Sequence, residues 1–304
     1  MESSYGEDLY TPGHRACPGC GASLAMRMIL QATGPNVIVI TATGCVETFT
    51  SQYPYSSWGV PWLHPLFENA GAVASGVEVA LRSKGLSEKV KVIAIGGDGG
   101  TLDIGMGSLS GMFERGHDVL FICYDNEAYM NTGVQRSSAT PIGASTMTTP
   151  LSQTEWGKAQ RKKNLAAIAL AHDIPYVATA SIGFPTDLIR KIKTALAIRG
   201  PKYLDIHSPC PIGWGFDSSR LIEVAKLAVQ TGLVPLYEAG YGRPLNSRRI
   251  SKRKPVEEYL GLQGRFRHLL EREDSEHIAA IQALADENIK NYELVAEGAK
   301  EAHG

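Results

Sequence analysis

The stretch Val90-Lys91-Val92-Ile93-Ala94-Ile95-Gly96-Gly97-Asp98-Gly99 decides the fold of this chain. Its apolar part, Val90–Ile95, is typical of a buried strand, and a glycine-rich turn with one carboxylate follows at once. A second apolar run, Val119–Tyr124, is followed in the same way by Asp125 and Asn126. Because ligands bind beyond the carboxyl ends of parallel strands, these polar residues mark that edge of a sheet as the candidate site.

Short β-rich runs alternate with helical patterns along the chain, which predicts parallel strands joined by right-handed crossovers. The fold class we expect is α/β, a parallel sheet with helices on both faces. The expected strands are Val37–Thr41, Val90–Ile95, Val119–Tyr124, Tyr176–Ala180 and Tyr203–His207. The expected helices are Ser23–Ala32, Ala70–Arg82, Gly105–Glu114, Leu165–His172 and Thr186–Ile198.

The pattern changes after about residue 218. We expect a helix over Leu221–Thr231, a stretch bearing Pro and Gly through Tyr241–Pro244, a basic run, and two more helices. The basic run is Arg248–Lys254, for which a solvated loop or a subunit contact is a better interpretation than a nucleic-acid patch. The last two helices are expected over Val256–Leu270 and Ser275–Ala296. We therefore divide the chain into a cofactor-binding domain, 1–231, and a C-terminal extension for subunit docking, 232–304.

The bulk composition excludes several classes of protein. The chain has 304 residues, and its 30 basic and 31 acidic residues nearly balance, which gives no sign of affinity for nucleic acid or membranes. No apolar run approaches the roughly 20 residues that cross a bilayer. The first residues, Met1–Ser4, lack a secretory pattern. We expect a cytoplasmic protein with no nucleic acid and no membrane among its partners.

Five cysteines in such a chain indicate metal or redox chemistry rather than disulfides. Cys123 lies inside an expected strand and is best interpreted as a core thiol. The pair Cys17 and Cys20 forms a CxxC, while Cys45 and Cys210 each follow an expected strand. Four loop thiols can hold one iron–sulfur cluster. A zinc site is the alternative, although zinc ribbons usually carry two CxxC pairs and this sequence has one.

The Gly97-Asp98-Gly99 turn and Asn126 offer oxygen ligands to a hard cation such as Mg²⁺. The glycines let the backbone approach a diphosphate closely. This arrangement resembles the GDG…N motif of thiamine-diphosphate enzymes, in which Mg²⁺ bridges the protein and the cofactor.

Longer segments resemble the β subunits of the pyruvate:ferredoxin oxidoreductase family, which belongs to the 2-oxoacid:ferredoxin oxidoreductases. The similarity covers nearly the whole chain, and Tyr124–Pro141 is its most specific part. The other segments that carry it are Gly13–Gly21, Ala42–Glu47, Gly96–Gly105, Cys210–Trp214 and Pro255–Leu260. Some relatives have an acidic residue at the position of Ala22, so this chain departs from their pattern there.

The resemblance implies thiamine diphosphate, Mg²⁺ and a [4Fe–4S] cluster as cofactors. The cluster ligands would be Cys17, Cys20, Cys45 and Cys210. Asp98 and Asn126 would bind Mg²⁺ through their side chains, and Ala128 through its carbonyl group. The residues around thiamine diphosphate would be Gly97, Asp98, Gly99, Asn126, Ala128, Met130, Asn131 and Cys45. Among these, Asn131 would lie beside the thiazolium and the substrate as the catalytic residue.

The resemblance also implies an activity and partners. The activity would be oxidative decarboxylation of pyruvate to acetyl-CoA and CO₂, with electrons passing through the cluster to ferredoxin. An α subunit would supply the glutamate that contacts the pyrimidine ring, and further subunits or domains would bind coenzyme A and ferredoxin-like clusters. Arg136–Pro141 resembles pyruvate-type relatives more than 2-oxoglutarate ones.

Several points stay open at this stage. A branched-chain 2-oxo acid, 2-oxoglutarate, an aryl pyruvate or oxalate is an alternative substrate, and a zinc-stabilised scaffold without activity is a more distant alternative. His64, Glu47 and Glu68 are possible polar neighbours of the site, but structural roles fit each of them at least as well.

Overall fold

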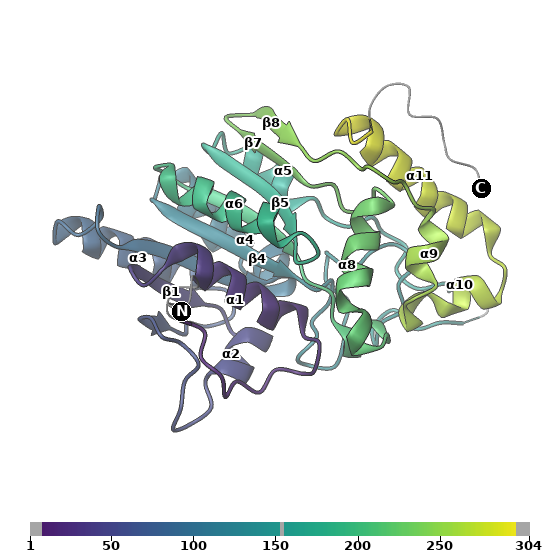
Figure 1. Cartoon of the computed structure of the whole chain (residues 1–304), viewed down its shortest axis with the longest axis horizontal. Helices are drawn as coiled ribbons and strands as arrows, with labels where there is room; N and C mark the ends of the chain where they lie inside the picture. The colour runs from purple at the N-terminus through teal and green to yellow at the C-terminus, as the bar shows by residue number, and fades with distance from the viewer. Residues whose placement is uncertain (1–7, 153–154, 296–304) are drawn as a thin grey trace, which may run out of the picture.

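The computed structural model describes residues 8–152 and 155–295, and an eight-stranded sheet lies at the centre of this part of the chain (Figure 1). The strand order is β2-β1-β3-β4-β6-β5-β7-β8. The first six strands of the chain pair in parallel, and β7 and β8 are antiparallel to their neighbours. The strands are β1 Val37–Thr41, β2 Trp62–Leu63, β3 Lys91–Gly97, β4 Val119–Asp125, β5 Tyr176–Ser181, β6 Lys202–His207, β7 Tyr237–Gly240 and β8 Arg243–Ser247.

The apolar runs of the sequence become the central strands. Every residue of β4 is buried, as is each of the residues from Val92 to Gly96 in β3. A parallel strand that is covered on both faces needs such a continuous apolar run. Cys123 lies within β4 with no exposed surface, so the prediction of a core thiol is confirmed.

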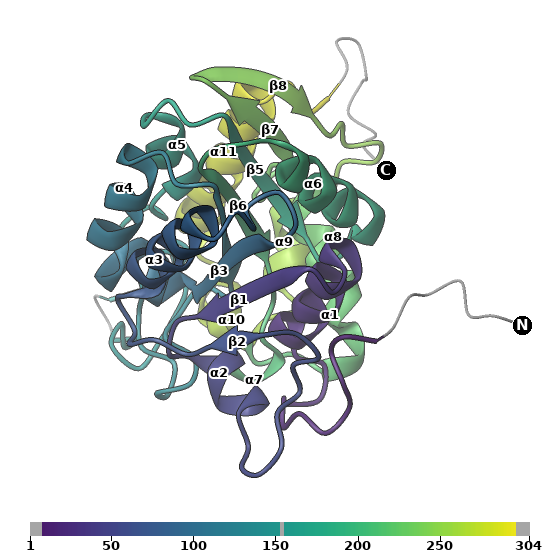
Figure 2. The same ribbon diagram turned by 90° about the vertical axis from the view of Figure 1, so that its left-hand side faces the viewer.

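Helices cover both faces of the sheet, as Figure 2 shows when the sheet is viewed on edge. One apolar core joins the sheet to α1 and α6, and a second core on the other face joins it to α3, α4 and α5. The predicted α/β fold is therefore confirmed. These helices are α1 Gly21–Thr33, α3 Ala70–Ser83, α4 Met106–Glu114, α5 Leu165–Leu170 and α6 Pro185–Ala197. Two short helices, α2 Cys45–Thr50 and α7 Pro211–Trp214, were not expected from the sequence.

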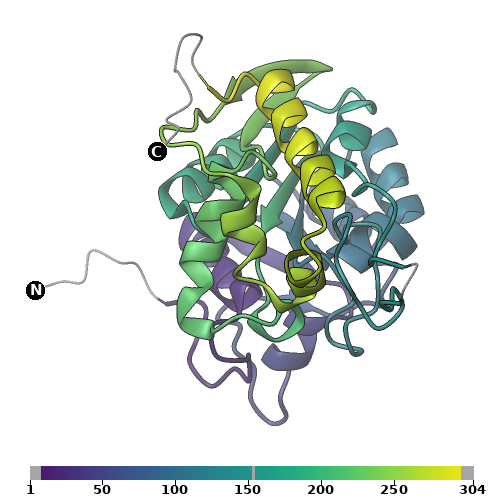
Figure 3. The same ribbon diagram turned by 90° about the vertical axis from the view of Figure 1, so that its right-hand side faces the viewer.

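A third apolar core lies among the C-terminal helices. Figure 3 shows these helices beside the sheet. Its helices are α8 Leu221–Gln230, α9 Val256–Leu260, α10 Arg267–Glu271 and α11 Ser275–Asn291. The prediction of one continuous helix over Val256–Leu270 is wrong. Gln263 has an extended backbone between α9 and a 3₁₀ turn at Gly264–Phe266, and the amide of Gly264 donates to Gly215 O instead (3.1 Å). No helix within the described ranges is long and apolar enough to cross a membrane.

The hairpin β7–β8 extends the sheet beyond β5. Its sequence, with a proline in β8, gave no clear strand signal, and an edge strand is where a sheet tolerates proline. The segment after residue 231 thus shares the sheet with the segment before it, and the division of the chain at that point stays a prediction. The helix expected over Ser275–Ala296 ends earlier, at Asn291, where Tyr292 takes the C-cap position. Met1–Ser4, which lack a secretory pattern, and Ala296 lie outside the described residues.

The basic run Arg248–Lys254 forms a mostly exposed loop whose side chains bind within the chain. The Arg248 guanidinium lies 4.4 Å from the ring centroid of Phe184. Arg253 pairs with α11, and Lys254 pairs with Glu258 of α9 at 2.8 Å. Two side chains of the run therefore contact the C-terminal helices, and a third contacts the residue before α6.

Candidate cofactor-binding site

One predicted site residue follows each of four strands at the carboxyl edge of the sheet. Cys45 follows β1, Asp98 follows β3, Asn126 follows β4, and Cys210 follows β6. The parallel register places these strand ends side by side. The edge is thus where segments far apart in the sequence meet.

The CxxC loop reaches the same edge from the start of α1. The amide of Gly21 donates to Pro209 O at 3.3 Å, directly before Cys210. A β-carbon at Gly21 would stand 2.5 Å from that carbonyl oxygen, so only glycine permits this approach. The loop that carries Cys17 and Cys20 is therefore fixed against the loop that carries Cys210.

Three oxygen-bearing groups converge beside β3 and β4. The side-chain amide of Asn126 lies 2.9 Å from both Asp98 Oδ1 and the carbonyl oxygen of Ala128, and its NH₂ group donates to both when turned toward them. With its oxygen turned toward them, three oxygens face one another. A separation of about 2.9 Å is the edge of an octahedron of oxygens that lie about 2.0–2.1 Å from a central Mg²⁺. The predicted ligand set fits that ion.

Asp98 is a buried carboxyl group whose ionised form lacks a close cation among the described residues. It is 1% exposed, and burial, together with the nearby Asp125, raises its pKa well above the usual range. Ser137 Oγ donates to it at 2.5 Å, which offsets part of this shift. The nearby Lys162 ammonium is bonded to Asp125 and Glu127 instead. A divalent cation beside Asp98 would stabilise the ionised carboxylate and lower its pKa.

Three of the four predicted cluster cysteines stand at helix N-termini. Cys20 is the N-cap of α1, Cys45 is the first residue of α2, and Cys210 is the N-cap of α7. The amide of Gly213 donates to Cys210 Sγ at 3.4 Å. Hydrogen bonds from the backbone amides at these helix starts lower the pKa of Cys20 and Cys210 and so offset part of the rise that burial causes, which makes the metal-binding thiolate less costly.

The four thiols also act on one another. Burial raises the pKa of Cys45 to about 12, with further contributions from Cys210, Cys20, Asp98 and Cys17. Burial likewise raises the pKa of Cys20 to about 11, and Cys210 and Cys17 add to the shift. Within residues 8–152 and 155–295, no three His, Cys, Asp or Glu side chains form a group that could hold a single metal ion. The thiols are thus gathered in one region but do not converge on one point.

The remaining predicted contacts lie close to these two groups. Asn131 Nδ2 donates to Thr48 Oγ1 of α2 at 3.2 Å, which places Asn131 by the helix that starts at Cys45. The sulfur of Met130 would stand 2.1 Å from a β-carbon on Gly213, so Met130 packs against α7 next to Cys210. Asn131 therefore lies beside the helix that begins at Cys45, and Met130 lies beside Cys210.

The structure adds an aromatic residue that sequence reasoning missed. The ring of Tyr129 covers Gly99, where a β-carbon would meet it at 2.3 Å. Tyr129 OH donates to Asp103 Oδ2 at 2.9 Å. Asp103 belongs to a π-helix, Gly99–Ile104, that begins directly after Asp98. Such π-helical turns are frequent at functional sites, but no residue pattern in the sequence signals one.

The three residues left open have structural contacts. His64 Nε2 lies 2.8 Å from Thr43 Oγ1, and its other ring nitrogen lies 3.9 Å from Glu47 Oε1. Glu47 accepts a hydrogen bond from Ser51 Oγ within the turns of α2 (3.1 Å). Glu68 is half-buried, and its carbonyl oxygen accepts from Ser108 Oγ (2.6 Å). His64 and Glu47 therefore stand beside the Cys45 loop, but no contact gives them a chemical role.

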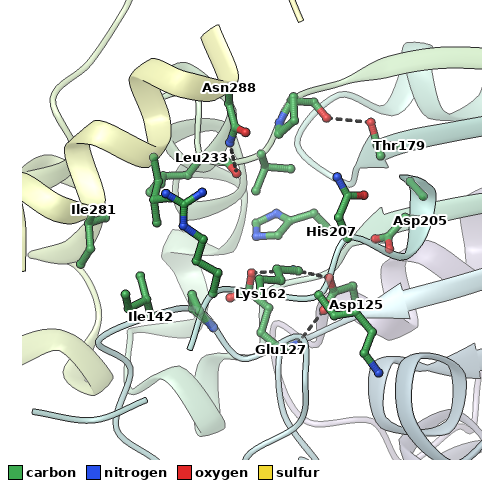
Figure 4. Close-up of a pocket in the computed structure, with 18 of the residues that line it drawn as sticks. Asp125, Glu127, Ile142, Lys162, Thr179, Asp205, His207, Leu233, Ile281 and Asn288 are labelled. Carbon is green, nitrogen blue, oxygen red and sulfur yellow. Dashed lines mark hydrogen bonds and ion pairs between the residues drawn. The ribbon is translucent and has the colours of Figure 1, made fainter. Parts of the chain in front are cut away.

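A cavity of about 350 Å³ lies behind the site, between the ends of β4, β5 and β6 and helix α11 (Figure 4). Lys162 lies at its floor and bridges Asp125 and Glu127, and His207 lies beside them. Burial lowers the pKa of His207 to about 3, so this ring is neutral. Neither Asp98 nor any cysteine lines the cavity, which is therefore separate from the predicted cofactor site.

The sequence of this chain matches a known domain family. Residues 42–206 match the family described as thiamine pyrophosphate enzyme, C-terminal TPP binding domain. A solved structure of 2-oxoglutarate:ferredoxin oxidoreductase from Magnetococcus marinus, with 2-oxoglutarate, coenzyme A and succinyl-CoA bound, has a similar fold. Its TM-score is 0.59, with 24% identity, over 86% of this chain and 92% of that chain.

Relatives match over most of their length. Pyruvate synthase subunit PorB of Methanosarcina barkeri is 57% identical over 295 residues, which cover 97% of this chain and 100% of that protein. Subunit PorB of Methanocaldococcus jannaschii is 50% identical over 93% of this chain and 96% of its own. Ketoisovalerate oxidoreductase subunit VorB of Pyrococcus furiosus is 46% identical over 86% of each chain. The chain belongs to the PorB family of pyruvate synthase subunits, a branch of the thiamine-diphosphate-dependent 2-oxoacid:ferredoxin oxidoreductases.

Proposed function

We propose that this chain is the cofactor-binding subunit of an enzyme that oxidatively decarboxylates pyruvate to acetyl-CoA and CO₂ and passes the electrons to ferredoxin. The observation that carries this proposal is the pairing of two donor sets at one edge of the sheet. Three oxygens suited to Mg²⁺ lie beside β3 and β4, and four cysteines lie on neighbouring loops or at the helix starts that follow them. The PorB relatives support pyruvate as the substrate.

Asp98, Asn126 and the carbonyl group of Ala128 would hold Mg²⁺ and, through it, the diphosphate. Bound thiamine diphosphate supplies a nucleophilic carbon and an electron sink for a 2-oxo acid. This chain fixes that cofactor in place and keeps the region next to Asn131 and Met130 close to the cysteines. Proximity of this kind suits transfer of electrons out of the cofactor.

Cys17, Cys20, Cys45 and Cys210 would hold the [4Fe–4S] cluster. A zinc ion needs four thiolates around one atom, whereas a cluster spreads its ligands over several atoms. The sequence has one CxxC pair, whereas zinc ribbons usually carry two, so these four cysteines fit a cluster better than zinc. Amides at helix N-termini, such as that of Gly213 toward Cys210, would also stabilise a cluster's sulfur atoms.

A branched-chain 2-oxo acid is the second candidate substrate, because a ketoisovalerate oxidoreductase subunit is 46% identical to this chain. The test is anaerobic purification of the chain with the subunits that co-elute. Iron, sulfide and zinc are then measured, and 2-oxo acids are screened with coenzyme A and a low-potential acceptor. Pyruvate should give the highest kcat/KM, whereas a colourless protein that contains zinc would rule out this proposal. A cytoplasmic location stays a prediction.

We expect this chain to be inactive on its own. It supplies the Mg²⁺ ligands and one cluster, and its sequence contains no CxxCxxC run of the ferredoxin type. The pyrimidine-side glutamate, the coenzyme A site and the later clusters would come from an α subunit and further subunits or domains. The isolated chain, loaded with iron, sulfide, Mg²⁺ and thiamine diphosphate, should therefore reduce no acceptor with pyruvate.

The control for that assay is the same preparation after partner subunits are added, which should restore turnover. Substantial turnover by the isolated chain would show that the site is complete without a partner.

A further inference from the structure

We infer that Arg265 is a positioning residue that holds the magnesium loop, Asn126–Ala128, and the cluster loop at Cys210 in register with each other. It does so through Glu127 and Trp214. Arg265 belongs to the C-terminal segment and is not an expected ligand of any cofactor. The inference rests on the proposed function, since it concerns how the same two donor sets are supported.

The magnesium loop has a backbone conformation that needs support. Glu127, between the two expected ligands, has a φ of 66°, in the left-handed region that costs a residue with a β-carbon free energy. Its amide donates to Asp125 Oδ1 at 3.0 Å, and its carbonyl oxygen accepts from Thr140 Oγ1 at 2.6 Å. With Glu127 held in this way, the Ala128 carbonyl oxygen comes back to within 2.9 Å of the Asn126 side chain.

The Glu127 side chain is held by two cations and so stabilises this turn. It is buried, and its carboxylate bonds Lys162 at 3.0 Å and Arg265 Nη2 at 2.6 Å. Lys162 is shared with Asp125. Among the described residues, Arg265 therefore forms an ion pair with Glu127 alone, whereas Lys162 divides its charge between Glu127 and Asp125.

Trp214 connects the same loop to the cysteines. Its side chain is fully buried, and Nε1 donates to the carbonyl oxygen of Asn126 at 2.8 Å. Trp214 is the last residue of α7, whose N-cap is Cys210. The amide of Trp214 donates to Cys210 O at 2.9 Å. One short helix thus carries a cluster ligand at one end and a contact to the magnesium loop at the other.

Arg265 touches both supports at once. Its guanidinium carbon lies 3.6 Å from the ring centroid of Trp214, while the same group bonds Glu127. Arg265 Nε donates to Gln263 Oε1 at 2.9 Å, and Ser145 donates its amide to Arg265 O at 3.0 Å. The guanidinium is thus fixed in orientation, and its planar shape allows stacking and charged hydrogen bonding together.

The test uses the enzyme assembled with its partner subunits and stripped of thiamine diphosphate. Calorimetric titration with thiamine diphosphate at several fixed Mg²⁺ concentrations gives the affinity. Loss of an outer support of a metal site typically costs 10–100-fold in affinity, and we expect that loss for Arg265→Met. Arg265→Lys, which keeps the charge but not the planar stack, should recover part of it.

Two further variants separate positioning from general stability. Trp214→Phe keeps a ring against the guanidinium but removes the hydrogen-bond donor to Asn126. Because the two residues are in contact, the loss of affinity in the double variant should be smaller than the sum of the free-energy losses in Trp214→Phe and Arg265→Met. Arg267→Met, an exposed arginine two positions away, is the matched control and should bind as the wild type does. Melting temperatures are compared for all variants.

A second readout reports on the cluster. Because α7 joins the two sites, bound Mg²⁺ and thiamine diphosphate should slow the release of iron to a chelator in the wild type. In Arg265→Met this slowing should be lost. If the wild type binds no thiamine diphosphate with Mg²⁺, the proposed function fails.

If the wild type binds and Arg265→Met matches it in both affinity and the slowing of iron release, this inference alone is overturned. Should Arg265→Met not assemble, Arg265→Lys and Trp214→Phe decide in the same way: wild-type behaviour of both would overturn it.

Discussion

Replacement of Cys17, Cys20, Cys45 or Cys210 by serine is expected to reduce the iron content of the assembled enzyme to near zero and pyruvate-dependent acceptor reduction to background. Serine is a poor ligand for the soft iron of a sulfide cluster. Iron and sulfide analysis, together with the visible spectrum under anaerobic conditions, measures the first effect.

Cys123→Ser is the matched control. Cys123 has no exposed surface and lies in the interior of β4, so its replacement should leave iron in place and change only stability. The hydroxyl would be buried in an apolar strand, which costs on the order of 1–3 kcal/mol if it finds no partner. Loss of iron in Cys123→Ser with normal iron in Cys210→Ser would show that the ligands are assigned wrongly.

The central fold was predictable because its strands carry their own signal. β3 and β4 are apolar runs that end in glycine or polar residues, and a sheet covered on both faces requires such runs. The same alternation of strands and helices predicts that Asp98 and Asn126 lie at one edge of the sheet. In β3 and β4 the local sequence pattern agrees with the position of each strand in the fold, so the strands could be predicted from the sequence.

The C-terminal part was less predictable because its structure depends on contacts with distant segments. The helical pattern of Val256–Leu270 is interrupted where the Gly264 amide bonds Gly215, some fifty positions earlier in the chain. β7 pairs with β5 in an antiparallel sense that no local pattern reveals.

In the candidate site, too, some residues could be predicted from the sequence and others could not. Its ligands were visible as residue types in motifs, whereas its supports were not. Trp214 lies within a segment that carried the resemblance, but the bond from its indole to Asn126 O depends on the fold. Arg265 gave no signal at all, since a single arginine in a helical pattern predicts only an exposed side chain. In the structure it is 5% exposed and lies against Trp214.

Asp98→Ala is expected to abolish the Mg²⁺-dependent binding of thiamine diphosphate. Asp98 is the one charged side chain among the three proposed ligands, and the ion that bridges to the diphosphate depends on it. Asn126→Ala should weaken binding less, because a neutral oxygen contributes less than a carboxylate. Calorimetric titration of the cofactor-free, assembled enzyme at fixed Mg²⁺ measures both effects.

The loss in Asp98→Ala should come without a fall in melting temperature, which distinguishes a lost ligand from a damaged fold. Burial and the proximity of Asp125 raise the pKa of Asp98, so its charged form is unfavourable when no cation is bound. Replacing Asp98 by alanine removes this unfavourable charge from the folded protein. Asp98→Asn, which keeps the size and a neutral oxygen but loses the charge, should bind much more weakly than the wild type and no worse than Asp98→Ala. Asp286→Ala, at an exposed carboxylate of α11, should bind as the wild type does. Unchanged affinity in both Asp98 variants would mean that this turn does not hold the metal.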